Sequence, residues 1–300
     1  MTFNMLKLEC KKAIFNKFFL LSILIGCLIT SSSLIPNIQS YYRDINMAKK
    51  LLDSGTVIYN SYGPLESLFN HWIGSEAISA GSVNFFFIFP ILIAIPYGWS
   101  YCLEKQKGYI RNVVLRSGKP RYYFSKYVAM FVSGGLAMVI PLLLNFIITA
   151  MFVPAVYPDP SYITGYGIFT ASILSKIFYT NPFLYVSLYL LVDFVFCGLI
   201  TCLCFALATF IKNRVVVVLM PFFILLAFRY ICTSFIYVSS TTVYKELSPL
   251  LFLHPVPPAY NTTWLIITVE AIIILIFNYL RFIIFKYTPR VVYCLVRFKI

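Results

Sequence analysis

Six apolar stretches, separated by polar segments, organise this chain. A helix of about 20 predominantly apolar residues is long enough to cross the hydrocarbon core of a bilayer. On that basis we predict membrane-spanning helices over residues 18–35, 85–103, 127–153, 183–211, 215–238 and 263–285. The pattern predicts an all-α integral membrane protein whose residues 1–300 form a single transmembrane domain.

Prolines and glycines predict where these helices end or bend. Pro36 follows the first apolar stretch, so we expect that helix to end there. Pro90 and Pro96 lie inside the second stretch, where each removes a backbone hydrogen bond and bends the helix. The adjacent Gly134 and Gly135 in the third stretch allow a neighbouring helix to approach closely, whether for packing or for motion.

The residues before the first span, 1–17, are basic and partly periodic. Spacing predicts a helix with one apolar face, formed by Phe3, Leu6, Cys10, Ala13 and Ile14, from which Leu8 and Phe15 deviate. One interpretation is an amphipathic helix that lies on the cytoplasmic membrane surface. The alternative is a charged flank that only orients the next span.

Composition and charge placement extend this picture. The chain is 60% hydrophobic and 11% charged, whereas soluble domains carry about 25% charged residues. The formal net charge is +14, and the cations flank the apolar stretches, which favours contact with lipid headgroups over nucleic-acid binding. They gather in residues 1–17, in 101–127, in 212–214 and after 280. By the positive-inside rule, these segments and both termini are cytoplasmic in a plasma membrane, and the connections 37–84, 154–181 and 239–262 are external.

Cysteine and histidine usage adds no further site. None of the eight cysteines falls in the connections assigned to the outside, so we expect no disulfide framework. His71 and His254 are isolated in the sequence, so we expect no metal site.

The segment from Tyr101 to Tyr127 is the most densely charged part of the chain, with seven cations and one acid, Glu104. We predict a short helix from Glu104 to Arg116, ended by Ser117-Gly118 and followed by Pro120. Its spacing places Lys107, Arg111 and Leu115 on one face. The opposite face carries four less polar side chains, Tyr109, Ile110, Val113 and Val114.

No GxxxxGK[ST] phosphate-binding loop occurs in the chain, since Gly118-Lys119 lacks the upstream glycine. The cytoplasmic loop shows a Glu and a Gly after the second span, then a Pro, a basic residue, a Tyr and a Lys before the third. These are Glu104, Gly108, Pro120, Arg121, Tyr122 and Lys126. With the basic N-terminal segment and six spans, this loop resembles that of the type-2 ABC exporter permease family.

The resemblance implies a transport subunit that is not itself an enzyme. It implies a coupling helix that docks on a separate ATPase subunit, through Glu104, Lys107, Gly108, Arg111, Leu115, Arg116 and Pro120. ATP and magnesium would be bound by that partner, with no cofactor on this chain, and the permease would pair with a second copy or a paralogue. The implied cargo is a peptide, an antibiotic or a lipid-like molecule, including antimicrobial peptides exported for self-protection. The alternative for the loop is that its charge serves only to orient the protein.

Three charged residues fall inside predicted spans: Asp193, Arg229 and Glu270. By helical rise they lie about 15, 13 and 10 Å below the external helix ends, so Arg229 can bridge one or both acids. An isolated charge in a span costs about 2.5–3.5 kcal/mol on insertion scales, which such a bridge would offset. The three residues form either a polar patch on a transport route or a structural clamp.

Two alternative function classes are an ion-coupled carrier and a membrane-embedded transferase. An ion-coupled carrier could use Asp193 and Glu270 as proton sites, but it should show an internal repeat, and none is convincing. A membrane-embedded transferase would need His, Asp or Glu clustered at one interface, and the two histidines stand alone.

Overall fold

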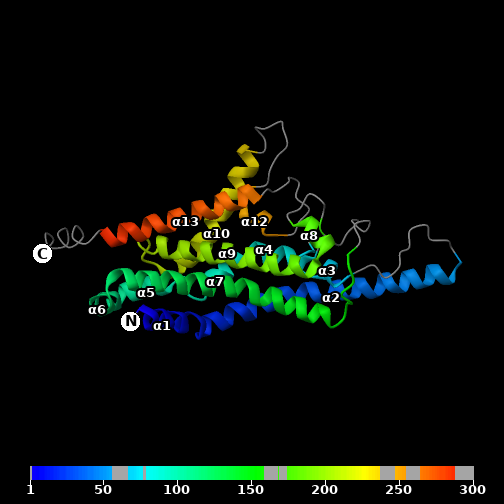
Figure 1. Ribbon diagram of the computed structural model, residues 1–300, viewed down its shortest axis with the longest axis horizontal. Coiled ribbons are helices and arrows are strands. Elements are labelled where there is room, and N and C mark those ends of the chain that lie inside the picture. The colour runs from blue at the N-terminus through cyan, green and yellow to red at the C-terminus, as the bar shows by residue number, and fades with distance from the viewer. Residues whose placement is uncertain are drawn as a thin grey trace.

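The computed structural model describes residues 2–55, 67–76, 79–158, 168, 174–236, 247–254 and 264–287. Within these ranges every regular element is a helix, in agreement with the predicted all-α class. Most of the long helices run along the long axis of an elongated bundle (Figure 1). The elements are α1 (Thr2–Ile14), α2 (Lys17–Asp53), α3 (Leu68–His71), α4 (Ala80–Ala94), α5 (Ser100–Gln106), α6 (Tyr109–Ser117), α7 (Lys119–Ala150), α8 (Ser175–Thr180), α9 (Pro182–Leu207), α10 (Arg214–Ile231), the π-helix η2 (Cys232–Ile236), α12 (Pro249–Phe252) and α13 (Trp264–Tyr287).

Four helices are long and apolar enough to cross a membrane: Lys17–Met47, Lys119–Ala150, Pro182–Leu207 and Arg214–Ser234. Two further apolar helices, Ala80–Ala94 and Trp264–Leu280, are shorter within the described residues. The architecture is thus that of a helical membrane protein. These six helices overlap the six predicted spans, and four of them reach spanning length.

The expectation that the first span ends at Pro36 is wrong. α2 continues through Pro36 to Asp53, although Pro36 cannot donate to the carbonyl of residue 32. Asn37 directly after the proline donates to the carbonyl of His71 at 3.0 Å and to the carboxylate of Glu76 at 3.3 Å. Tertiary contacts of this kind stabilise the helix beyond its proline.

The second predicted span is broken rather than merely bent. α4 ends at Ala94, a turn contains Pro96, and α5 starts at Ser100. Pro96 has no N–H to donate to the carbonyl of Leu92, four residues earlier. The hydroxyl of Ser22 on α2 donates to that carbonyl instead, at 2.7 Å. Pro90 remains inside α4, as expected.

The other predicted span boundaries shift by less. α7 begins at Lys119 instead of Tyr127, because Gly118 precedes it and Pro120 occupies its first turn, where no N–H is needed. α9 ends at Leu207 instead of Ile211. α13 covers the sixth predicted span. α10 covers the fifth up to Ile231, η2 continues it to Ile236, and positions 237 and 238 lie outside the described residues.

α7 and α9 pack along a seam of glycines. A Cβ added at Gly134 would lie 2.0 Å from the Thr201 hydroxyl oxygen, and one at Gly135 would lie 2.5 Å from the Phe194 ring. From α9, a Cβ at Gly198 would lie 2.7 Å from the ring of Phe131. The predicted close approach at Gly134 and Gly135 is confirmed, and only glycine fits at these positions.

A short buried segment, Ser67 to Glu76, fills the end of the bundle at α3. All ten of its residues are buried. The indole of Trp72 donates to the carbonyl of Leu142 on α7 at 3.0 Å, and its ring packs edge-on against Phe146 and Tyr189. This non-spanning segment is thus enclosed by protein and packed against α7 and α9.

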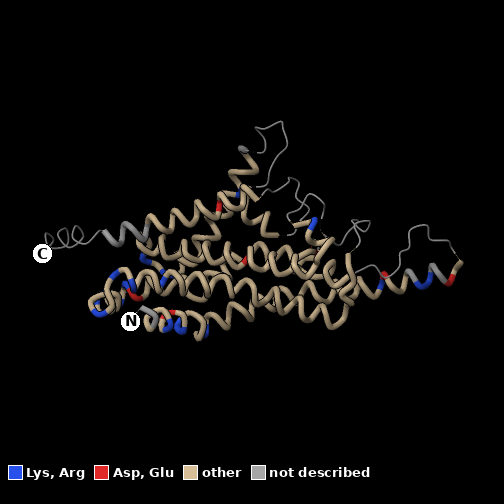
Figure 2. The backbone as a smooth tube through the Cα atoms, in the orientation of Figure 1, with Lys and Arg blue, Asp and Glu red and all other residues tan. Residues whose placement is uncertain are grey.

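Charge is distributed unequally between the two ends. Figure 2 shows Lys and Arg gathered at the end formed by α1, α5 and α6, with a largely uncharged middle. This basic end agrees with the predicted side for residues 1–17, 101–127 and 212–214. Much of the predicted external connections, and the basic tail beyond 287, lie outside the described residues.

Candidate functional site at the basic end

α6 is a separate short helix bounded by two glycines. Gly108 precedes it with φ of 69° and Gly118 follows it with φ of 81°, conformations that glycine adopts without strain. The predicted continuous helix from Glu104 to Arg116 is therefore wrong, since α5 ends at Gln106 and the chain turns at Gly108. Lys107 consequently does not share a helix face with Arg111 and Leu115.

The predicted two-sidedness of this segment is confirmed within α6 for three of the four inner residues, whereas Tyr109 is exposed. Ile110, Val113 and Val114 pack against a buried cluster that includes Ala13, Tyr122 and other residues of the basic end. On the outer side Arg111 and Arg116 are exposed, and Leu115 keeps 79% of its surface accessible. An exposed leucine between two arginines on a short, anchored helix is a candidate contact surface.

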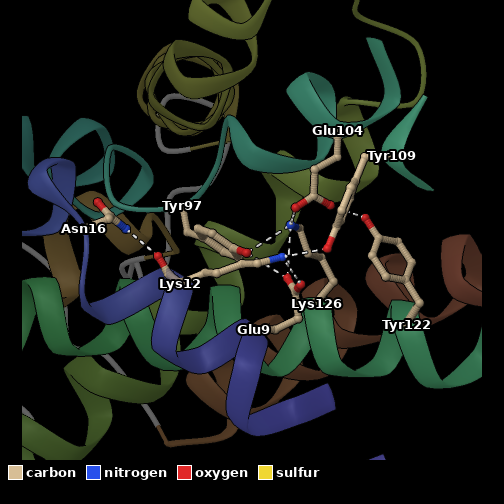
Figure 3. Close-up of polar contacts among 8 residues, drawn as sticks. All are labelled: Glu9, Lys12, Asn16, Tyr97, Glu104, Tyr109, Tyr122 and Lys126. Carbon is tan, nitrogen blue, oxygen red and sulfur yellow. Dashed lines mark hydrogen bonds and ion pairs between the residues drawn. The ribbon is translucent and has the colours of Figure 1, made fainter. Parts of the chain in front are cut away.

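Glu104 lies on the inner side, although it was predicted as a coupling residue together with the exposed ones. Its carboxylate forms an ion pair of 2.7 Å with the ammonium group of Lys126 on α7 and accepts a hydrogen bond from the hydroxyl of Tyr122 (Figure 3). Its side chain is only 14% exposed. Glu104 therefore anchors α5 to α7.

Lys126 is fully buried, and all three donors of its ammonium group have partners. It donates to Glu104 at 2.7 Å, to the Tyr97 hydroxyl at 3.0 Å and to the Glu9 carboxylate at 3.2 Å. An ammonium group has three N–H bonds, so none is left unsatisfied. A buried charge with this set of partners is compatible with the low local dielectric.

Glu9 brings α1 into the same cluster. Burial by itself would raise the pKa of the Glu9 carboxyl, but the charge of Lys126 and the hydrogen bond from Tyr97 outweigh it, with a contribution from Lys12. The net result is a pKa lowered from its ordinary value. Glu9 is therefore a carboxylate at neutral pH, and α1, the turn before α5, and α7 meet at this ion cluster.

α1 also contacts α6 directly. Lys12 forms an ion pair of 3.0 Å with Glu9 and donates to the hydroxyl of Tyr109 on α6 at 3.2 Å (Figure 3). One turn further, Asn16 donates to the carbonyls of Ala13 and Pro96, and its side-chain oxygen accepts from the N–H of Phe19. The junction of α1 and α2 is thus attached both to α6 and to the turn at Pro96.

α5 is also attached to the turn between α9 and α10. Gln106 donates to the carbonyl of Lys212 at 2.6 Å, and Lys105 donates to the carbonyl of Thr209 at 3.0 Å. The Cys102 thiol also contacts the Lys212 carbonyl, at 2.8 Å. Polar contacts at the basic end therefore connect α5 and α6 with α1, α7, α9 and α10.

Most of the predicted coupling residues are accessible together. The exposed ones are Lys107, Gly108, Arg111, Leu115, Arg116 and Pro120.

The sequence analysis did not predict Glu9 and Tyr97 as part of the site. The available signal was Glu9 itself, the single acid among the lysines of residues 1–17, placed one turn before Ala13 on the face that becomes buried.

Part of the apolar face predicted for α1 packs on protein. Ala13 is fully buried and Cys10 packs against the cluster beside α7, as does Met5, which lies outside the predicted face. The two residues that deviated from the predicted stripe, Leu8 and Phe15, face outward with 46% and 80% of their surfaces exposed. Any contact of α1 with the bilayer would thus involve Leu8, Phe15 and the neighbouring exposed Lys11.

The three predicted intramembrane charges do not form the expected clamp around Asp193. Asp193 on α9 is fully buried, and no Lys, Arg or His nitrogen of the described residues lies within 4.0 Å of its carboxylate. Arg229 on α10 and Glu270 on α13 are partly buried. The predicted bridge from Arg229 to Asp193 is therefore absent.

Comparison with known proteins returns no match. No protein-family model, no curated protein and no solved structure is significantly similar to the chain. Membership of the exporter-permease family thus remains a hypothesis that depends on the residues of this chain alone.

Proposed function

We propose that the chain is the membrane-spanning subunit of an ATP-driven exporter of the type-2 ABC class, and that a separate ATPase subunit docks on α6. The observation that carries the proposal is the outer face of α6. Arg111, Leu115 and Arg116 are exposed there, while the inner face and Glu104 are anchored in the protein. An exposed apolar residue flanked by arginines is typical of a protein contact.

The contacts beneath α6 would transmit a displacement of this helix to the helices that it touches. A partner that displaces α6 acts on α1 through Tyr109 and Lys12, and on α7 through the packing of Val113 and Val114. It acts on α9 and α10 through α5, which binds the 209–212 turn. Hydrolysis of ATP, with its magnesium, takes place in the partner, because this chain has no phosphate-binding loop.

The remaining parts of the proposal follow from the same class. Six spans with both termini in the cytoplasm of a plasma membrane place α6 where an ATPase can reach it. A second permease, identical or paralogous, would complete the transporter. The cargo would be a peptide, an antibiotic or a lipid-like molecule, with antimicrobial peptides as one candidate.

The test uses the full chain purified from membranes of its source cells. We expect an ATPase without membrane spans to co-purify and to hydrolyse ATP in lipid nanodiscs. Combining Arg111→Glu with Leu115→Asp should remove this subunit and its activity. Lys176→Glu, a charge reversal on exposed α8 at the opposite end, should leave both unchanged. A double variant that keeps the ATPase at wild-type amounts would refute docking on α6.

A further inference from the structure

Asp193 is an isolated carboxyl group in the interior of the bundle. It lies near the middle of α9, with Tyr189 one turn before it and Cys197 one turn after it, and both are buried. Its exposed fraction is 0%, and neither carboxyl oxygen has a hydrogen-bond partner among the described residues. No other described acid is both fully buried and left without such a partner.

The two buried tyrosine hydroxyls on α9 before Asp193 already donate to backbone carbonyls. Tyr185 donates its hydroxyl proton to the carbonyl of Gly74 at 2.8 Å, and Tyr189 donates to the carbonyl of Leu253 at 2.7 Å. Neither phenol therefore has a proton left to donate to Asp193. A carboxylate normally requires several donors when it is buried.

Counter-charges are equally lacking. α9 packs against α4, α7, α8, α10 and α13, and α4 carries no charged residue. Tyr189 also packs on Trp72, which follows His71, and bonds the residue before His254. The charged residues and histidines on these neighbours whose side chains the structure describes form no ion pair with Asp193. They are His71, Lys119, Arg121, Lys126, Lys176, Arg214, Arg229, His254 and Glu270.

Water has little access to this position. The Asp193 side chain has no exposed surface, and the residues one turn before and after it, Tyr189 and Cys197, are buried on the same face of α9. An ionised carboxylate in such surroundings would lack both hydration and a partner, at a cost of many kcal/mol, and such groups take up a proton instead.

We propose that Asp193 is a proton-binding site, occupied while the packed bundle encloses it and emptied when the helices around α9 separate. On separation, water reaches Asp193, the O–H bond of the carboxylic acid breaks, and the proton passes to water while the carboxylate becomes hydrated. Repacking reverses the step. The conformational change of the bundle is thereby coupled to the uptake and release of one proton, whether or not an ATPase drives it.

Infrared spectroscopy of the full-length protein in lipid nanodiscs tests the site directly. The C=O stretch of a protonated carboxylic acid is separate from the carboxylate bands. We expect such a band at neutral pH in the wild-type protein and its loss in Asp193→Asn. The control Glu270→Gln should keep the Asp193 band. If Asp193→Asn leaves every protonated-carboxyl band intact, the proposal is overturned.

A second measurement keeps the test decisive if Asp193→Asn does not fold. The wild-type band is followed from mildly acidic to mildly alkaline pH while the bundle stays folded by circular dichroism. A buried acid should keep its proton across this range and exchange it slowly in heavy water. Absence of any protonated band at neutral pH would overturn the proposal. Because neither spectrum involves an ATPase, failure here leaves docking on α6 unaffected, and the reverse also holds.

Discussion

Lys126 on α7 and Glu104 on α5 form a largely buried ion pair of 2.7 Å at the basic end of the bundle. The pair is part of a larger cluster in which Lys126 also binds Glu9 of α1. Segments far apart in the sequence therefore meet at one ammonium group. The first predictions concern this group and its partners.

Lys126→Met should destabilise the protein strongly. The substitution leaves Glu9 and Glu104 without their cation, and breaking a buried ion pair from one side costs about 3–5 kcal/mol. Thermal denaturation in detergent measures the loss. Lys107→Met removes an equivalent but exposed cation and should change stability by less than about 0.5 kcal/mol. Equal melting temperatures for the two variants would contradict the role of the cluster.

Stability should fall in acid because of Glu9. Its pKa is lowered in the folded protein, so its stabilising contribution is fully present above the unfolded-state pKa of about 4.3 and is lost as pH falls through the lower native value. The wild-type melting temperature should therefore decline more steeply across this window than that of Glu9→Gln. Parallel curves for the two proteins would show that the Glu9 carboxylate contributes nothing.

Glu104 and Arg111 should have separable effects. Arg111→Ala removes an exposed side chain of α6 and should weaken binding of the proposed ATPase without changing thermal stability. Glu104→Gln weakens the ion pair that anchors α5 to α7, so its main effect should be a lower melting temperature. Measuring melting and ATPase retention on the same samples distinguishes the two. An Arg111→Ala variant that melts early yet keeps its ATPase would reverse these assignments.

Ser22→Ala should cost about 1–3 kcal/mol. The Ser22 hydroxyl is the donor to the Leu92 carbonyl that Pro96 leaves free, and an unsatisfied buried acceptor carries a penalty of that size. Ser32→Ala removes an exposed hydroxyl that bonds only within α2 and serves as the control. Denaturation midpoints of the two variants should differ clearly, and a neutral Ser22→Ala would show that another donor replaces it.

The hydropathy pattern predicted the helices well, but proline positions did not predict their ends. Pro36 and Pro96 look alike in sequence, yet α2 runs through the first and the helix breaks at the second. The difference lies in tertiary contacts, at Asn37 in one case and at Ser22 in the other. Such contacts join residues many positions apart, so no local pattern reveals them.

The sequence predicted the two faces of α6 but not the contacts beneath them. The amphipathic spacing of residues 109–117 identified the exposed Arg111 and Leu115, and Gly108 marked a break that helix periodicity alone overlooks. Glu104 was singled out by its motif position, but its inward orientation depends on Lys126 and Tyr122. Glu9 pairs with Lys126 across 117 positions, a separation at which charge alone does not identify a partner.

The buried segment from Ser67 to Glu76 gives the two ends of the bundle different vulnerabilities. The basic end is held by ion pairs, so acid or a neutral substitution loosens it. At the opposite end, Trp72 contributes ring packing and a hydrogen bond to the Leu142 carbonyl, neither of which involves a titrating group, and Glu76 accepts a hydrogen bond from Asn37. A substitution at Trp72 and one at Lys126 should therefore loosen different ends of the same bundle.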